Sequence, residues 1–263
     1  MTRVLAIDWS GRRTGAEKHI WIAEATAGEL VRLEPGRTRE QVQDHLVALA
    51  RDEELVVGLD FSFSLPEWFL DARGHRTAPE LWDAAASAGE DWLRACEPPF
   101  WGRRGRPRPE LPAHFRRTEA GLAAVGGVRP KSTFQIGGAG SVGSGSVRGF
   151  PVLAALQRAG FSVWPFDPPR LPLVVEIYPR LITGPVVKSD PEARRAHLDA
   201  VAGISPPWRD LAAASEDAYD AAVSAVAMSL HLDDLLALPL VEDPVSCREG
   251  CVWQPPRAGI TRW

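Results

Sequence analysis

The chain is poor in cysteine and has no long apolar run. Its 263 residues include three cysteines, Cys96, Cys247 and Cys251, and an odd, sparse set argues against a disulfide framework. Cys247 and Cys251 lie four apart with no second pair, so we do not expect a zinc site. No stretch reaches the roughly 20 apolar residues needed to span a membrane, and the apolar run at the N-terminus is too short for a signal peptide. We therefore expect a cytoplasmic protein without a membrane partner.

Lysine is also scarce, and arginine greatly outnumbers it. The formal net charge is −4, the sequence pI is near 5.9, and the only lysines are Lys18, Lys131 and Lys188. A protein that grips long nucleic acid over its whole surface is usually basic, so any such contact here must be local. The 45% hydrophobic content is ample for a single domain over 1–263, with an insertion over 97–150.

The first 65 residues alternate short apolar runs with one amphipathic segment. "RVLAIDWS" predicts a buried strand that ends at Asp8, and 18–25 with 29–34 predict a hairpin. Thr38 and Gln41 form a capping box for a following helix, and "LVVGLD" predicts a second buried strand that ends near Asp60. A right-handed crossover would make the two buried strands parallel, which brings both aspartates to the carboxyl edge of the sheet, where ligands bind.

The second half continues with α/β units. A helix is expected over 79–95, strands over 160–166 and 171–179, and a last helix over 215–231. The later strand contains Glu176, an acid that is costly to bury without a partner. Three antiparallel strands, a crossover helix, parallel strands and a final acidic helix make up the ribonuclease H arrangement. The predicted fold class is therefore α/β, a ribonuclease H-like mixed sheet flanked by helices, with a loop-rich insertion.

The last helix opens with acids that a solvated helix start explains only in part. Asp217 and Asp220 are three apart and share one face. The helix dipole accounts for Glu216 and fairly well for Asp217, but poorly for Asp220, a turn further in beside apolar residues. Gathering these acids with Asp8, Asp60 and Glu176 would raise their pKa values, and a hard divalent cation would offset the repulsion. We therefore expect Mg²⁺ or Mn²⁺, two of which can cleave a phosphodiester.

Residues 97–117 are rich in proline, glycine and arginine, with Phe100, Trp101 and Phe115 among six arginines. Two interpretations stay open: a solvated loop, or a phosphate-backbone contact with aromatic stacking. Residues 131–156 are rich in glycine and serine before a helix expected near Phe150. The GxGxxG there is rejected as a dinucleotide fingerprint, because no normal strand precedes it and the helix starts too late. The candidate substrate-binding residues are Ser10, Arg103, Arg104, Lys131, Ser132, Gln135 and Arg148.

Five blocks carry a resemblance to a known family: "AIDWSG", "GLDFSFSLP", "KSTFQIGGAGSVGSGSVRG", "EIYPR" and "DAYDAAVSAVAM". They resemble the signature blocks of the domain of unknown function 429, a group of predicted ribonuclease H-like nucleases, over nearly the whole chain. The last block is also similar to the final helix of Holliday-junction resolvases, where two aspartates three apart bind metal. The resemblance implies that Asp8, Asp60 and Asp217 are metal ligands and that Asp220 is a fourth ligand or lies behind them. Glu176 would ligate metal or orient Arg180.

Three functions follow from these patterns. The first is a metal-dependent nuclease or phosphodiesterase, with Asp8, Asp60, Asp217, Asp220 and Glu176 as its catalytic acids and a nucleic acid or nucleotide as substrate. The second is an ATP-dependent phosphotransferase, since "DWSG" has the shape of a first phosphate loop, although 263 residues is short for the two sheets such proteins need. The third is a non-catalytic module on the same fold that binds nucleic acid or nucleotides.

Overall fold

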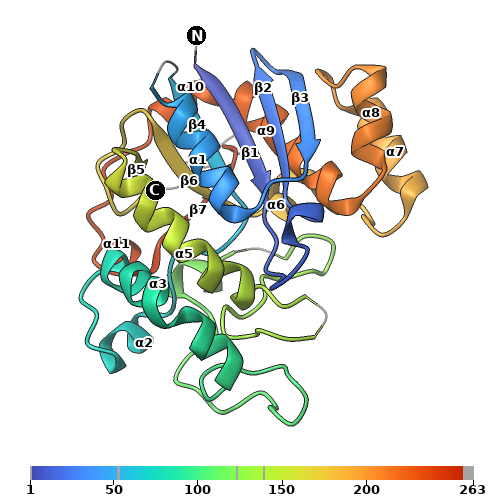
Figure 1. Ribbon diagram of the computed structural model, residues 1–263. Helices are drawn as coiled ribbons and strands as arrows, with labels where there is room; N and C mark the ends of the chain where they lie inside the picture. Colours follow the sequence, from blue (N-terminus) through green and yellow to red (C-terminus); the bar gives the residue numbers. More distant parts are fainter. Residues whose placement is uncertain (1, 52–53, 123, 139, 257–263) are drawn as a thin grey trace.

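The computed structural model describes residues 2–51, 54–122, 124–138 and 140–256. They form a seven-stranded mixed sheet with helices around it (Figure 1). Six of the strands follow the order β3-β2-β1-β4-β6-β5, and the seventh, β7, pairs with β6. β1 pairs antiparallel with β2 and parallel with β4, and β4 pairs parallel with β6 (Figure 1). β5 and β7 pair with opposite ends of β6. The predicted ribonuclease H-like order is thus confirmed. The strands are β1 (Arg3–Asp8), β2 (Trp21–Thr26), β3 (Glu29–Pro35), β4 (Leu55–Leu59), β5 (Ser162–Val163), β6 (Leu173–Ile177) and β7 (Val252–Trp253).

Eleven α-helices are found in the part of the chain that the structure describes. They are α1 (Arg39–Leu49), α2 (Glu67–Ala72), α3 (Ala78–Ala95), α4 (Arg117–Ala120), α5 (Gly143–Arg158), α6 (Pro179–Thr183), α7 (Pro191–Ala200), α8 (Pro206–Ala213), α9 (Glu216–Leu230), α10 (Leu232–Leu236) and α11 (Ser246–Glu249); a 3₁₀ turn spans Ala16–Lys18. The predicted capping box of α1 is present, with the side chains of Thr38 and Gln41 each accepting from the other's backbone N–H. The start of α1 that the sequence predicted from this capping box is thus confirmed.

Helices cover both faces of the sheet. Leu5, Ile7 and Val57 belong to one buried cluster with α1, α3 and α5, whereas Val4, Ala6 and Val56 belong to a second cluster with α9 and its neighbours. This division follows from the two-residue period of a strand. Figure 1 shows α1 and α5 on one side of the sheet and α9 on the other. For a residue at the end of a strand, its position in this alternation therefore decides on which face of the sheet its side chain lies.

α5 begins at Gly143, seven residues before the start expected from the sequence. The expectation near Phe150 was wrong because glycines are poor helix formers, yet here close packing requires them. A Cβ atom on Gly149 would lie 2.3 Å from the ring of Phe61, and one on Gly11 would lie 2.5 Å from the backbone nitrogen of Gly145. Tertiary contact with the turn after β1 thus overrides local propensity.

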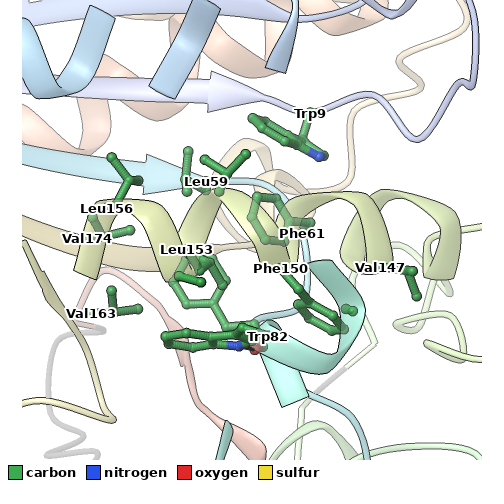
Figure 2. Packing of buried hydrophobic residues seen from close by; sticks show 14 of the residues in the cluster. Trp9, Leu59, Phe61, Trp82, Val147, Phe150, Leu153, Leu156, Val163 and Val174 are labelled. Carbon is green, nitrogen blue, oxygen red and sulfur yellow. Dashed lines mark hydrogen bonds between the residues drawn. The ribbon is translucent and has the colours of Figure 1, made fainter. Parts of the chain in front are cut away.

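The loop-rich insertion shares a core with the sheet. Phe100 and Phe134 are buried in the same cluster as Leu59 and Phe61. Figure 2 shows Trp9, Phe61, Phe150 and Trp82 in this continuous cluster, around α5. Trp9 and Phe61 are 4.9 Å apart between ring centroids. The insertion is therefore held by the same aromatic cluster that contains Trp9 and Phe61, the residues that follow Asp8 and Asp60.

None of the helices in the described ranges is long and apolar enough to cross a membrane.

Replacing Gly149 by alanine tests the close packing of α5. Alanine normally favours a helix over glycine by about 1 kcal/mol, but the new methyl group would overlap the Phe61 ring. We expect Gly149→Ala to lower the free energy of unfolding by about 1–3 kcal/mol in urea denaturation. Gly121→Ala, where the added Cβ meets no atom within 4 Å, is the matched control and should leave stability unchanged or slightly raised. Equal stability of Gly149→Ala and the wild type would contradict this packing.

Candidate active site

Asp8 and Asp60 meet at the carboxyl edge of neighbouring parallel strands. β1 ends at Asp8, and the residue after β4 is Asp60, whose N–H donates to the carbonyl of Ile7 at 3.1 Å. The alternation that directs Val4 and Ala6 toward α9 directs Asp8 to that side as well. Asp8 is only 8% exposed. Two carboxylates are therefore brought together where the sheet ends, as the sequence predicted.

α9 adds two further acids from its first turns. Ser215 caps the helix by accepting from the N–H of Ala218, as the sequence indicated. The small side chains of α9 and Gly58 of β4 let the helix lie close to the sheet, since a Cβ on Gly58 would lie 2.6 Å from Sδ of Met228. Asp220 is buried, whereas Asp217 is half-buried and contacts Nδ1 of His19 at 3.1 Å. The two aspartates thus approach Asp8 and Asp60 from the second layer.

Burial and neighbouring charges perturb Asp8, Asp60 and Asp220. Burial raises the pKa of Asp60 to about 8, and the charge of Asp220 adds to this effect. Burial also raises the pKa of Asp8 well above its ordinary value, with Asp60, Asp220 and Asp217 each contributing. The pKa of Asp220 is raised to about 6, mainly by burial. These carboxylates are costly to keep ionised, so their gathering does not serve stability.

Lys188 supplies the positive charge nearest to this group. Its ammonium group forms an ion pair with Oδ2 of Asp220, and it lowers the pKa values of Asp8 and Asp60. The segment that carries it, between α6 and α7, is held by two arginines. Arg180 donates to the carbonyl of Val186 at 2.7 Å, and buried Arg194 donates to the carbonyl of Lys188. Lys188 is therefore held over the acids by the fold.

The acidic group fits Mg²⁺ or Mn²⁺ in the chemistry of its donor atoms. Carboxylate oxygens are the ligands these ions prefer, and Oδ1 of Asp220 is buried with no hydrogen-bond partner. The chemistry of the donors therefore fits a hard cation. In the described ranges, however, no group of three or more His, Cys, Asp or Glu side chains is arranged to hold a metal ion. The charges of these acids act on one another, but their arrangement in this structure is not that of a metal site, and Lys188 is paired with Asp220.

Glu176 is close enough to raise the pKa of Asp60, but it lies on the other side of the sheet from Asp8 and has a different partner. Val174 belongs to the cluster on the α5 side of the sheet, and the alternation of β6 directs Glu176 to the same side. There it accepts two bonds from Arg116 and one from the N–H of Phe63 at 2.9 Å. Arg180, the partner considered from the sequence, instead binds backbone carbonyls.

Arg116 is fully buried, so neither interpretation of the arginine-rich loop describes it. It also donates to Glu119 at 2.9 Å and to the carbonyl of Glu249 at 2.8 Å. Burial alone would lower the pKa of Arg116, but the carboxylates of Glu119 and Glu176 raise it above its ordinary value. This pairing ties the insertion to β6 and to the C-terminal segment.

The predicted substrate-binding residues are placed in different surroundings. Arg148 is held by Glu90, at 2.6 and 2.9 Å, and by the carbonyl of Gly11. Buried Ser132 donates to the carbonyl of His114, and buried Ser10 accepts from the N–H of Arg12 at 3.3 Å. Both serines therefore shape loops in this structure.

The side chains of the remaining predicted substrate-binding residues are more exposed to solvent. Gln135 is partly buried and donates to the carbonyl of Gly137 at 3.3 Å. Arg103 and Arg104 are exposed, and Arg103 donates to the carbonyl of Arg94 at 3.4 Å. Lys131 is exposed and borders a cavity that also contacts Asp60. Of the seven residues, Lys131 is thus placed beside one of the acids.

No protein-family model, curated protein or solved structure matches the chain. The resemblance to the domain of unknown function 429 family therefore remains a prediction from the five sequence blocks. The ribonuclease H-like order of the sheet is established by the structure itself.

Lys188, Arg116 and His19 are the site residues that the sequence reasoning missed. Each contacts an acid that the reasoning had selected, but from 32, 60 and 198 residues away in the chain. Such pairs leave no local pattern. The rarity of lysine could have drawn attention to Lys188, which is one of only three lysines in the chain.

Asp60→Asn tests the electrostatic cost of the acids. The pKa of Asp60 is about 8 in the folded chain against an ordinary value of 3.8, so the folded state retains a proton that the unfolded state releases. Stability should therefore be greatest below pH 4 as far as this group is concerned, and fall as pH rises toward 8. In EDTA-treated protein, the variant should exceed the wild type at pH 8 by on the order of 2 kcal/mol in urea denaturation, with a smaller difference at pH 5.

Asp91→Asn is the control for that measurement, because Asp91 is exposed and pairs with Arg94 on the surface. It should change stability by less than about 1 kcal/mol at either pH. A loss of stability in Asp60→Asn at pH 8 would contradict the electrostatic account.

Arg116→Met tests the buried ion pairs on the opposite side. Removing the guanidinium leaves Glu176 and Glu119 buried without their partner, so we expect a loss of about 3–5 kcal/mol in unfolding free energy. Adding Glu176→Gln should restore part of that loss. Arg94→Met, which removes an exposed ion pair, should cost less than about 1 kcal/mol. A similar small cost for Arg116→Met would show that the buried pairing is dispensable.

Proposed function

We propose that this protein is a metal-dependent nuclease or phosphodiesterase that hydrolyses phosphodiester bonds. The observation that carries the proposal is the gathering of Asp8, Asp60 and Asp220 at the carboxyl edge of a ribonuclease H-like sheet, where burial and neighbouring acids raise the pKa of each carboxyl. The fold accepts an electrostatic penalty at the edge where ligands bind in open α/β sheets. A divalent cation is the ligand that would relieve it.

The acids have distinct proposed roles. Asp8 and Asp60 would hold the ion that contacts the scissile phosphate, and Asp217 would help to hold a second. Asp220 would be available as a further ligand when its ion pair with Lys188 opens. When bound, Mg²⁺ or Mn²⁺ supplies positive charge to the phosphate and makes a coordinated water more acidic. Lys188, released from Asp220, would remain close enough to attract the phosphate.

Glu176 has a supporting role in this proposal. Its carboxylate is engaged by Arg116 and by the backbone of Phe63, so it anchors the loop after β4 that carries Asp60. The substrate would be a nucleotide or a short or structured nucleic acid, because the net charge of −4 disfavours a long phosphate backbone spread over the surface. Arg103 and Arg104 are exposed for such local contacts.

A second candidate is a non-catalytic module that binds nucleic acid or nucleotides. It is favoured by the absence, over the residues that the structure describes, of a group of three or more side chains arranged to hold a metal ion. In that case Lys188 would be a permanent partner of Asp220.

Calorimetric titration with Mn²⁺ tests the proposal. The wild type should bind Mn²⁺, and Asp8→Asn should weaken binding at least tenfold, since it removes a ligand and a charge. Asp91→Asn, on an exposed ion pair away from the acids, should bind like the wild type. The same proteins would then be assayed with branched DNA, an RNA–DNA hybrid and nucleotide substrates. We expect hydrolysis by the wild type and Asp91→Asn and none by Asp8→Asn.

Three results would count against the proposal. Hydrolysis by Asp8→Asn at the wild-type rate would exclude these acids from catalysis. Mn²⁺ binding that Asp8→Asn leaves unchanged would put the ion elsewhere. Substrate binding without Mn²⁺ binding or hydrolysis would support the non-catalytic module.

A further inference from the structure

A cavity of about 160 Å³ begins at Asp60 and extends to the α5 side of the sheet. The loop after β4, the first turn of α5 and the β6–β7 edge form its walls. Asp8, Asp217 and Asp220 do not line it, so it is a separate space that shares Asp60 with the acidic group. Any ligand within it would have one end next to that group.

The walls are largely apolar and aromatic. Trp9 and Phe61 pack against each other, and the indole N–H of Trp9 donates to the carbonyl of Gly145 at 3.2 Å. These two rings are therefore fixed by the fold. Tyr178, by contrast, is only partly buried, and Ile177 and Val252 continue the apolar wall. A small, flat, apolar ring system is the kind of group that such walls accept.

The polar groups of the cavity favour an anion at one end. Lys131 is exposed at its border, and the 16-residue helix α5 starts there without a side-chain cap. The ammonium group attracts negative charge, whereas the N–H groups of Gly143 and Gly145 in the first turn of α5 already donate to the carbonyls of Gln135 and Val142. Glu119 and Glu176 also line the cavity, but Arg116 pairs with both and offsets their repulsion of an anion.

We propose that this cavity is a base-binding subsite, which takes one nucleobase and leaves the attached sugar and phosphate at its open border near Lys131, with Asp60 also lining the cavity. The base would lie against the apolar wall and Tyr178. This subsite rests on the proposed function, because it would bind a single nucleotide of the proposed substrate. The small volume excludes a base pair, so a duplex would have to present an unpaired or terminal nucleotide.

Calorimetric titration of the full chain in EDTA tests this subsite without metal or catalysis. The probes are the nucleoside 5′-monophosphates, with ribose 5-phosphate and inorganic phosphate as ligands that lack the base. We expect at least one monophosphate to bind tenfold or more tightly than ribose 5-phosphate. Equal affinity for ribose 5-phosphate, or no binding of any monophosphate, would overturn the proposal.

Two variants place the binding in the cavity. Ser141→Trp puts a large ring at a lining position and should weaken monophosphate binding at least tenfold, whereas Ser87→Trp on the exposed face of α3 should have no effect. Lys131→Ala changes an exposed side chain that the fold does not need, and should weaken binding several-fold. Unchanged affinity in correctly folded Ser141→Trp, or in Lys131→Ala, would exclude the cavity as the site.

Asp8→Asn separates this proposal from the proposed function. The variant should lose Mn²⁺ binding and hydrolysis but retain monophosphate binding in EDTA, because Asp8 does not line the cavity. Hydrolysis of a substrate by wild-type protein that binds no monophosphate would refute the subsite alone. Monophosphate binding by wild-type protein that binds no Mn²⁺ would refute the nuclease proposal alone.

Discussion

The electrostatic cost of burying and gathering the carboxylates of Asp8, Asp60 and Asp220 is the constraint on which the candidate site depends. The acids come from two parallel strands and from the helix packed behind them, so the topology itself brings them together. Lys188, which forms an ion pair with Asp220, offsets this cost only in part, because burial and the charge of Asp220 still raise the pKa of Asp60 to about 8. Such a cost at a ligand-binding edge is typical of a site that functions with a cation.

The sheet separates two kinds of chemistry at this edge. On the α9 side, the acids lie with too little positive charge. On the α5 side, Glu176 and Glu119 are matched by buried Arg116, and the glycine-rich start of α5 packs against the turn after β1. The second side is therefore balanced in charge and closely packed, and it forms the wall of an apolar cavity. Asp60, at the end of a central strand, is the residue that both sides share.

The sequence predicted those parts of the fold that depend on local patterns. Strand ends identified Asp8 and Asp60, and the phase of the last helix identified Asp220 as an acid on its buried face. The start of α5 was wrong by seven residues, because close packing on Phe61 outweighs the low helix propensity of glycine. Arg116 and Lys188 were missed for a related reason. Their partners lie far away in the chain, and only the folded structure brings such groups within hydrogen-bond distance.

The measurement that tests the central claim most directly is a crystal structure with Mn²⁺, using anomalous scattering at the manganese edge. Our account predicts an anomalous peak beside Asp8 and Asp60, with the ammonium group of Lys188 withdrawn from Asp220. The contradicting result would be Lys188 still paired with Asp220 at saturating Mn²⁺, with no anomalous peak at the carboxyl edge. In that case the acids would be balanced by the protein alone.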